Sequence, residues 1–234
     1  MYERKVGFLA WLVIVTTSVW VGLTIYQQVS LPPSQTLIEK IQQIESGYLL
    51  FVINYVNAGL ITLGCTALFA GFYVICRKVS PLWSAVALVF VPIYGIANLA
   101  AYLSQVFVVP GIIEMSHASQ TEPMAMVLLA QLIHEWPGSA MQFLNGLAYA
   151  VLGIPSILFG SIFWQKKHSP KLGSGLLILS GLLSLLALIG IGLRSPVLMS
   201  LSLASGFIFL VSLISIAAYL LRKKPSENSQ QATH

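Results

Sequence analysis

The stretch that decides the fold runs from residue 48 to residue 109: YLLFVINYVNAGLITLGCTALFAGFYVIC, then RKVSP, then LWSAVALVFVPIYGIANLAAYLSQVFVV. Neither apolar run holds a charged residue, and each exceeds the roughly 20 residues that a helical membrane crossing needs. The intervening Arg77-Lys78-Val79-Ser80-Pro81 is too short for anything but a tight turn. The stretch therefore predicts two transmembrane helices joined at one membrane surface.

Working outward, four more apolar runs of similar length flank this pair. The six predicted spans are 6–26, 48–76, 82–109, 138–164, 172–193 and 197–221. Only 8% of the chain is charged, against about 25% in soluble domains. The alternating ten-residue segments of a membrane β-barrel do not occur. We predict an all-α polytopic helical membrane bundle, a single domain over 1–224, with a disordered polar tail over 225–234.

The basic residues predict the orientation. Ten of the twelve form four clusters beside the spans: Arg4 and Lys5; Arg77 and Lys78; Lys166, Lys167 and Lys171; Arg222, Lys223 and Lys224. All four clusters lie at the same end of a six-span bundle, so the positive-inside rule puts both termini in the cytoplasm. The net charge of +5 is spread over short clusters that adjoin spans. Anionic lipid headgroups are therefore the expected counter-charge, and nucleic acid is not.

Two long external connections are expected to carry helices. In the first, Leu37, Ile38, Ile41 and Ile44 recur at helical spacing between polar residues, which predicts an amphipathic helix. In the second, residues 124–135 predict a more apolar helix that Pro137 interrupts. A shift of 89 residues aligns Leu63, Gly64 and Gly71 with Leu152, Gly153 and Gly160, so an internal duplication remains open.

Amides and phenols gather in the outer half of three spans, at helical spacing. These candidate ligand-binding residues are Asn54 and Asn57; Tyr94, Asn98, Tyr102 and Gln105; and Gln142, Asn145 and Tyr149. Unpaired amides are costly in hydrocarbon, so these side chains should face one another, water or a ligand. Two interpretations stay open: interhelical hydrogen bonds that hold the bundle together, or an outward-facing pocket for a small apolar or amphiphilic molecule.

The spans lack the groups that most membrane chemistry needs. The chain holds no Asp, and no Glu, Lys, Arg or His falls inside a predicted span, which argues against a proton pump or a proton-coupled carrier. All four histidines lie outside the spans, which disfavours a membrane haem. No cofactor and no metal site are expected. His134 and Glu135 are weak candidates for acid–base catalysis. Adjacent helical residues diverge by about 100°, so these two cannot readily bind one metal together.

The segment Lys166-Lys167-His168-Ser169-Pro170-Lys171-Leu172-Gly173, with the span count, resembles uncharacterised six-helix bacterial membrane proteins grouped as domains of unknown function. The resemblance implies a multi-pass protein of the bacterial inner (plasma) membrane and carries over no catalytic residue. We expect a non-enzymatic protein that binds a small apolar or amphiphilic ligand, or a partner's transmembrane helix. Alternatives are a facilitative transporter without ion coupling, an intramembrane lipid-modifying enzyme, and an accessory subunit of a larger complex. Expected partners are membrane lipids and a membrane protein or second copy.

Overall fold

The computed structural model describes residues 2–30, 34–167 and 169–222. All regular structure in these ranges is helical: α1 (Tyr2–Ser30), α2 (Leu37–Ser46), α3 (Tyr48–Cys76), α4 (Pro81–Phe107), α5 (Val109–Ser116), α6 (Glu122–Leu132), α7 (Ala140–Gln165), α8 (Lys171–Gly192) and α9 (Pro196–Arg222). Six of these helices are long and apolar enough to cross a membrane. The predicted all-α class and the six spans are confirmed. The predicted tail 225–234 lies outside the described residues, as do His168, Lys223 and Lys224, and the single-domain assignment stays a prediction.

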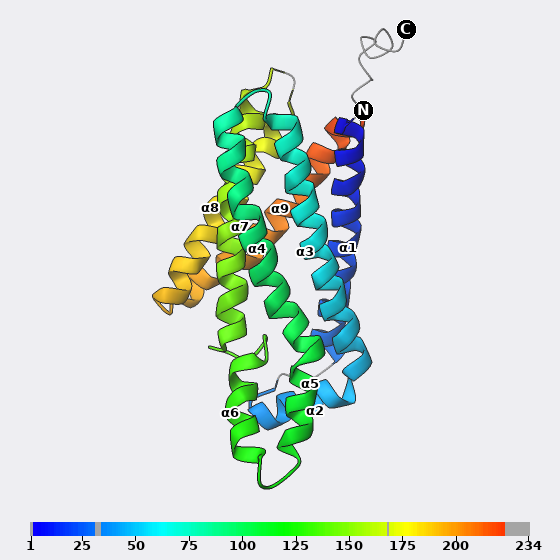
Figure 1. The fold of residues 1–234 in the computed structure, drawn as a ribbon, viewed down its shortest axis with the longest axis vertical. Coiled ribbons are helices and arrows are strands. Elements are labelled where there is room, and N and C mark those ends of the chain that lie inside the picture. The colour runs from blue at the N-terminus through cyan, green and yellow to red at the C-terminus, as the bar shows by residue number, and fades with distance from the viewer. Residues whose placement is uncertain (1, 31–33, 168, 223–234) are drawn as a thin grey trace.

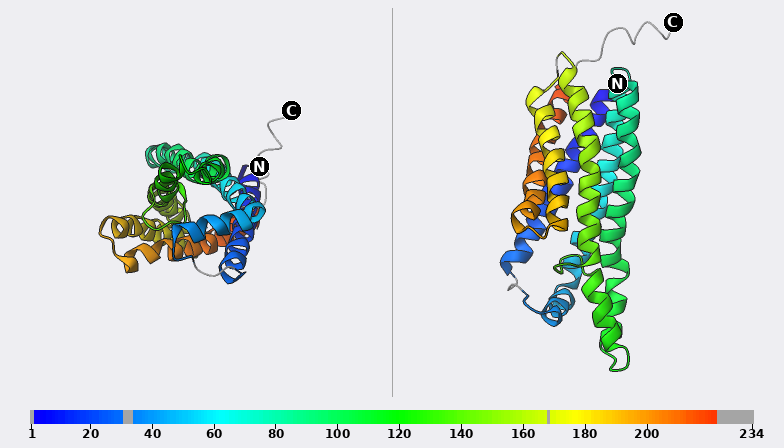
Figure 2. Two further views of the ribbon diagram at one scale, coloured as in Figure 1. Left: turned by 90° about the horizontal axis from the view of Figure 1, so that it is seen from below. Right: turned by 90° about the vertical axis from the view of Figure 1, so that its left-hand side faces the viewer.

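The long helices form a closed ring. Each packs against the next in the order α1, α3, α4, α7, α8, α9, and α9 returns to pack against α1 (Figure 1). Chain order of the long helices is therefore also spatial order, across the tight turns and also across the longer connections that hold α2, α5 and α6. The view from below in Figure 2 shows the same circuit along its axis.

The two ends of the ring differ. The start of α1, the α3–α4 and α7–α8 turns and the end of α9 lie together at one end, called here the basic end (Figure 1, top). The described basic residues there are Arg4, Lys5, Arg77, Lys78, Lys166, Lys167, Lys171 and Arg222. The short helices α2, α5 and α6 gather at the opposite end, called here the capped end. The α8–α9 hairpin stops short of these short helices (Figure 2, right).

Aromatic side chains fill the ring toward the basic end. Phe69, Phe72, Phe159 and Phe163 are fully buried. The ring centroids of Phe72 and Phe163 lie 5.2 Å apart, and those of Phe69 and Phe72 lie 5.4 Å apart, both edge to face. This half of the bundle is a packed apolar core.

The short helices depart from the expected boundaries. The third span ends at Phe107, and α5 follows after a break at Val108, with a proline in its first turn where the missing N–H costs nothing. The helix expected over 124–135 is α6, which ends at Leu132 and leaves residues 133–139 as a loop. Helix α2 is amphipathic, whereas α6 buries Leu129 yet leaves Met124 and Val127 more than half exposed.

Candidate ligand-binding site

A partly enclosed pocket of about 420 Å³ lies at the capped end. Its lining comes from α1, α2, α3, α4, the residues before α2 and the loop after α6. The lining residues are Trp20, Thr24, Ser34, Gln35, Lys40, Asn54, Tyr55, Tyr102, His134, Glu135, Trp136 and Pro137. The volume falls within the range of small-molecule sites, which combine apolar walls with a few placed polar groups.

Helix α2 is positioned against the pocket by its cap and its apolar face. The Thr36 hydroxyl accepts from the Glu39 backbone N–H at 3.2 Å, and the Glu39 carboxylate accepts from the backbone N–H groups of Gln35 (2.7 Å) and Thr36 (3.2 Å). These two backbone donors, Gln35 foremost, lower the pKa of Glu39. Ile41 and Ile44 are buried in an apolar cluster with residues of α3, α5 and α6. Fixed at its start and along one face, α2 brings Lys40 to the pocket.

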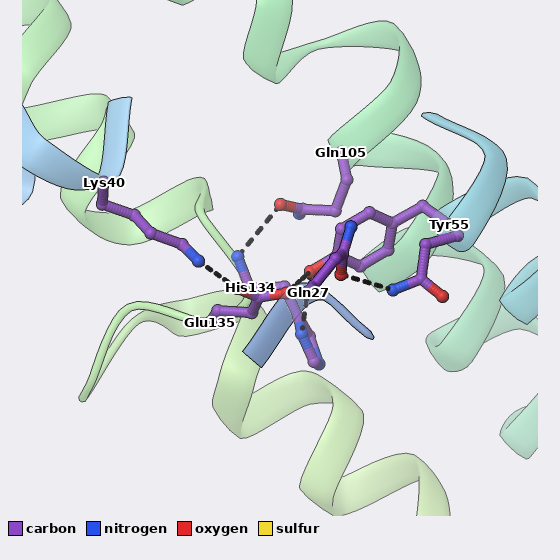
Figure 3. Close-up of polar contacts among 7 residues, drawn as sticks. Gln27, Lys40, Tyr55, Gln105, His134 and Glu135 are labelled. Atoms are coloured by element: carbon purple, nitrogen blue, oxygen red, sulfur yellow. Dashed lines mark hydrogen bonds and ion pairs between the residues drawn. The ribbon is translucent and has the colours of Figure 1, made fainter. Parts of the chain in front are cut away.

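The loop after α6 is pinned to α4 by Gln105 (Figure 3). The Gln105 side chain is fully buried; its amide nitrogen donates to the Leu132 carbonyl at 2.8 Å, and its amide oxygen accepts from the His134 backbone N–H at 3.0 Å. One amide thus satisfies two backbone groups where α6 ends. This arrangement fixes the backbone of His134 and Glu135.

Lys40, Glu135, Tyr55 and His134 form a continuous polar chain (Figure 3). Lys40 Nζ pairs with Glu135 Oε2, the Tyr55 hydroxyl donates to Glu135 Oε1 at 3.2 Å, and Tyr55 Oη lies 3.4 Å from His134 Nδ1. Tyr55 has one hydroxyl proton, and the carboxylate can only accept. His134 Nδ1 is therefore the donor toward Tyr55, which leaves Nε2 unprotonated.

His134 is neutral at pH 7. Burial lowers the pKa of His134 to about 4; nearby Lys40 adds to this effect and the Glu135 carboxylate opposes it. Its ring lies between two phenols, with centroids 5.8 Å from Tyr55 and 5.6 Å from Tyr102. A neutral imidazole with a free Nε2 can accept a hydrogen bond or a proton.

Three lining residues hold a buried polar atom with no hydrogen-bond partner among the described residues: Thr24 Oγ1, Asn54 Oδ1 and His134 Nε2. Asn54 is 4% exposed, and its amide nitrogen donates to Gln27 Oε1 at 3.2 Å. An unsatisfied buried polar atom costs about 1–3 kcal/mol. The lining residues therefore hold hydrogen-bonding capacity that the described protein groups leave unused. Each of the three atoms is closed to a water-sized probe in this structure, so a ligand in the pocket reaches it only after a side-chain rotation.

Comparison with known proteins gives a family. The model of the family described as Domain of unknown function (DUF4386) matches residues 6–223. The chain belongs to this family. No curated protein and no solved structure matches it. Membership of the DUF4386 family confirms the expected kind of family and, like the resemblance seen in the sequence, assigns no site residue.

In this DUF4386 protein the nine candidate residues separate by role. Asn54 and Tyr102 line the pocket, and Gln105 positions its loop. The others lie outside the lining, and most of them bond within the bundle. Asn57 donates to the Thr16 carbonyl at 3.0 Å. Asn98 donates to Thr62 Oγ1 at 2.8 Å and to Tyr94 Oη at 3.4 Å. The hydroxyls of Tyr149 and Tyr102 bond at 2.9 Å, and the Gln142 side-chain oxygen accepts from the Gly138 N–H at 2.9 Å. Asn145 Oδ1 and Asn98 Oδ1 have no partner among the described residues.

Much of the lining lies outside the residues predicted from the sequence. These unpredicted residues include Trp20 and Thr24 from α1, Lys40 from α2, and Tyr55 from α3. A readable signal existed on the first span, because Trp20, Thr24 and Gln27 follow at i, i+4 and i+7, the spacing that drew attention to the third span. The weak candidates His134 and Glu135 lie in a loop and not in a helix. Their side chains therefore need not diverge as on a helix, and both contact the Tyr55 hydroxyl.

Proposed function

We propose that this multi-pass membrane protein binds a small amphiphilic molecule in the capped-end pocket. The observation that carries the proposal is the group of three unpartnered polar atoms, from Thr24, Asn54 and His134, in a pocket also lined by Trp20 and Trp136. Aromatic walls receive apolar parts of a ligand, and the free polar atoms receive its head.

The proposal includes an orientation. The basic end faces the cytoplasm, and the capped end faces the outside of a bacterial inner membrane. Support comes from the clustering of basic residues, Arg77 and Lys78 among them, at one end of the ring, because short cytoplasmic segments carry an excess of Lys and Arg.

The depth of the pocket supports an amphiphilic ligand. Asn54 precedes Cys76, the last residue of α3, by 22 positions, which at about 1.5 Å per residue corresponds to roughly 33 Å along the helix. The hydrocarbon core of a bilayer is about 30 Å thick. The α8–α9 hairpin also ends before α2, α5 and α6 begin (Figure 2). Pocket residues therefore stand at the level of the outer headgroups, where a ligand can keep its tail in the membrane.

Binding accounts for the geometry better than transport does. A facilitative transporter needs a path from the pocket to the basic end, and that half is filled by Phe69, Phe72 and Phe159, all fully buried. The remaining alternatives from the sequence, a partner's transmembrane helix and an accessory subunit, predict a bound protein in place of a small molecule.

One observation favours a second candidate, an intramembrane enzyme acting on lipid. A neutral His134 with a free Nε2 can take up a proton, and Tyr55 links it to Glu135, but its lowered pKa of about 4 makes it a weak base at neutral pH. Catalysis predicts that His134→Ala abolishes turnover of the bound molecule while the molecule is still retained. Recovery of an unchanged ligand from both the wild type and His134→Ala excludes the enzyme interpretation.

Native mass spectrometry of the protein released gently from its own membrane tests the proposal. We expect a discrete bound mass in the wild type and in Asn145→Leu, and its loss in Asn54→Leu. Asn145 is a matched control because it too has an unpartnered Oδ1 yet does not line the pocket. A retained protein partner without a small molecule, or an equal mass in all three proteins, overturns the proposal.

A further inference from the structure

The fixed charges of the pocket cancel. Lys40 and Glu135 pair with each other, and His134 is uncharged at pH 7. Among the described lining residues there is no other ionisable group except the phenols of Tyr55 and Tyr102. A charged ligand group would enter without a free counter-charge, and burial of an unpaired charge is strongly unfavourable. The pocket is therefore suited to an uncharged head.

The unused hydrogen-bonding capacity is mainly accepting. Asn54 Oδ1 can only accept, and His134 Nε2 accepts because the proton of that ring is on Nδ1, facing Tyr55. The Thr24 hydroxyl can do either. Hydroxyl groups donate and carry no charge, whereas esters, ketones, carboxylates and quaternary ammonium groups offer no donor.

We propose that the pocket binds the uncharged, hydroxyl-bearing head of an amphiphile. Side-chain rotation on binding turns Asn54 Oδ1, His134 Nε2 and Thr24 Oγ1 toward the cavity, where ligand hydroxyls donate to the first two and bond to the third. Buried donors and acceptors discriminate strongly, because an analogue that lacks the matching group leaves them unpaired. The inference rests on the proposed function and adds the class of ligand. The same head chemistry is present in a membrane lipid with a glycerol or sugar head and in a free polyol.

The test uses the full-length protein in phosphatidylcholine nanodiscs and a set of probes with one oleoyl chain. Monooleoylglycerol has an uncharged head with two hydroxyls, methyl oleate is uncharged without a donor, oleate is anionic, and oleyltrimethylammonium is cationic without a donor. Free glycerol represents the soluble source. The readout is tryptophan emission, because Trp20 and Trp136 line the pocket. Monooleoylglycerol should give a saturable change, with methyl oleate and both charged probes at least tenfold weaker.

Variants locate the binding. Asn54→Leu and Thr24→Val should each weaken monooleoylglycerol binding several-fold, and Asn145→Leu should leave it unchanged. Circular dichroism and size-exclusion chromatography report whether each variant folds. Thr24→Val keeps the shape of the side chain, so it still tests the proposal if Asn54→Leu does not fold. Equal saturation by free glycerol would indicate a soluble polyol, and saturation by the lipid alone a membrane source; both support the hydroxyl head.

The outcomes separate this inference from the proposed function. Methyl oleate, oleate or oleyltrimethylammonium could bind as tightly as monooleoylglycerol and lose that binding in Thr24→Val. This result overturns the inference of a hydroxyl-bearing head and leaves the proposed binding function intact. If no probe gives a saturable signal, the inference of a hydroxyl-bearing head is overturned. The presence or absence of a bound mass in native mass spectrometry then decides whether the proposed binding function holds. Monooleoylglycerol binding that neither pocket variant weakens overturns the assignment of the three atoms.

Discussion

Lys40 on α2 and Glu135 in the loop after α6 form an ion pair beside the pocket that both residues line, although 95 positions separate them in the chain. Their side chains are 15% and 40% exposed, so the pair is only partly shielded from water. The pair adds a polar link between two segments that share one apolar cluster, in which Ile41 and Ile44 of α2 lie with Leu129 of α6 and Ile133 of the loop. Its role is thus to hold the two walls of the pocket together.

Breaking this pair should loosen α2 more than it destabilises the protein. Partly exposed ion pairs contribute at most about 1 kcal/mol, so Lys40→Met should shift the unfolding transition little. Hydrogen–deuterium exchange over residues 37–46 should nevertheless rise, because α2 loses its link to the loop. Lys78→Met, the same change at an exposed position of the basic end, is the control. Exchange in α2 that is equal in both variants would contradict the role given to the pair.

The stability of the protein should depend on the ionisation of His134. Burial lowers the pKa of His134 from 6.5 to about 4 in the folded protein. Above pH 6.5 the residue is neutral in both states and its full contribution is present. As the pH falls from 6.5 toward 4, the unfolded chain takes up a proton that the folded protein does not, so stability declines by up to roughly 3 kcal/mol.

Unfolding midpoints between pH 8 and pH 4 check this sign. The wild type should lose stability relative to His134→Gln below pH 6.5, since the glutamine cannot titrate. Parallel curves for the wild type and His134→Gln would show that His134 is not buried in a neutral form.

Bundle and site differ in how far local sequence determines them. The spans follow from apolar length and the turns from short basic segments such as Arg77-Lys78, both of which are local properties. The spacing of Asn98 and Tyr102 likewise marks a buried polar stripe. Periodicity does not tell whether such a stripe meets another helix or a cavity, and here Asn98 bonds Thr62 while Tyr102 reaches both Tyr149 and the pocket.

The walls of the pocket depend on long-range contacts. Lys40 reaches the site because α2 packs on α3, α5 and α6, and Glu135 reaches it because Gln105 fixes the loop where α6 ends. Neither relationship follows from the spacing of residues within one segment. The helix expected up to residue 135 ends at Leu132 for the same reason, since the Gln105 amide satisfies groups that a further helical turn would have used.

Asn98 and Thr62 should be coupled weakly. Asn98 is fully buried and donates to Thr62 Oγ1 at 2.8 Å, and the Thr62 hydroxyl donates to the Ala58 carbonyl at 2.9 Å. Hydrogen bonds between membrane helices average about 0.6 kcal/mol, so a double-mutant cycle of Asn98→Ala and Thr62→Ala should give a coupling near that value. The measurement is reversible unfolding in mixed micelles. Asn57→Ala, whose partner is the Thr16 carbonyl, should be additive with Thr62→Ala. A coupling above about 2 kcal/mol would contradict this account.

The contact between α7 and α8 at Gly153 and Gly181 leaves no room for an added carbon. A Cβ at Gly153 would lie 2.7 Å from the Gly181 carbonyl oxygen, and one at Gly181 would lie 2.4 Å from the Gly153 carbonyl oxygen. Both obstacles are helix backbone, which moves only if α7 and α8 separate. Gly153→Ala and Gly181→Ala should each destabilise by about 1–3 kcal/mol, the typical cost of overpacking. A Cβ at Gly206 on α9 would meet no atom within 4 Å, so Gly206→Ala should be neutral or slightly stabilising through its better helix propensity. Unfolding midpoints of the three variants in one detergent check the order. Equal midpoints would mean that α7 and α8 are not in backbone contact at Gly153.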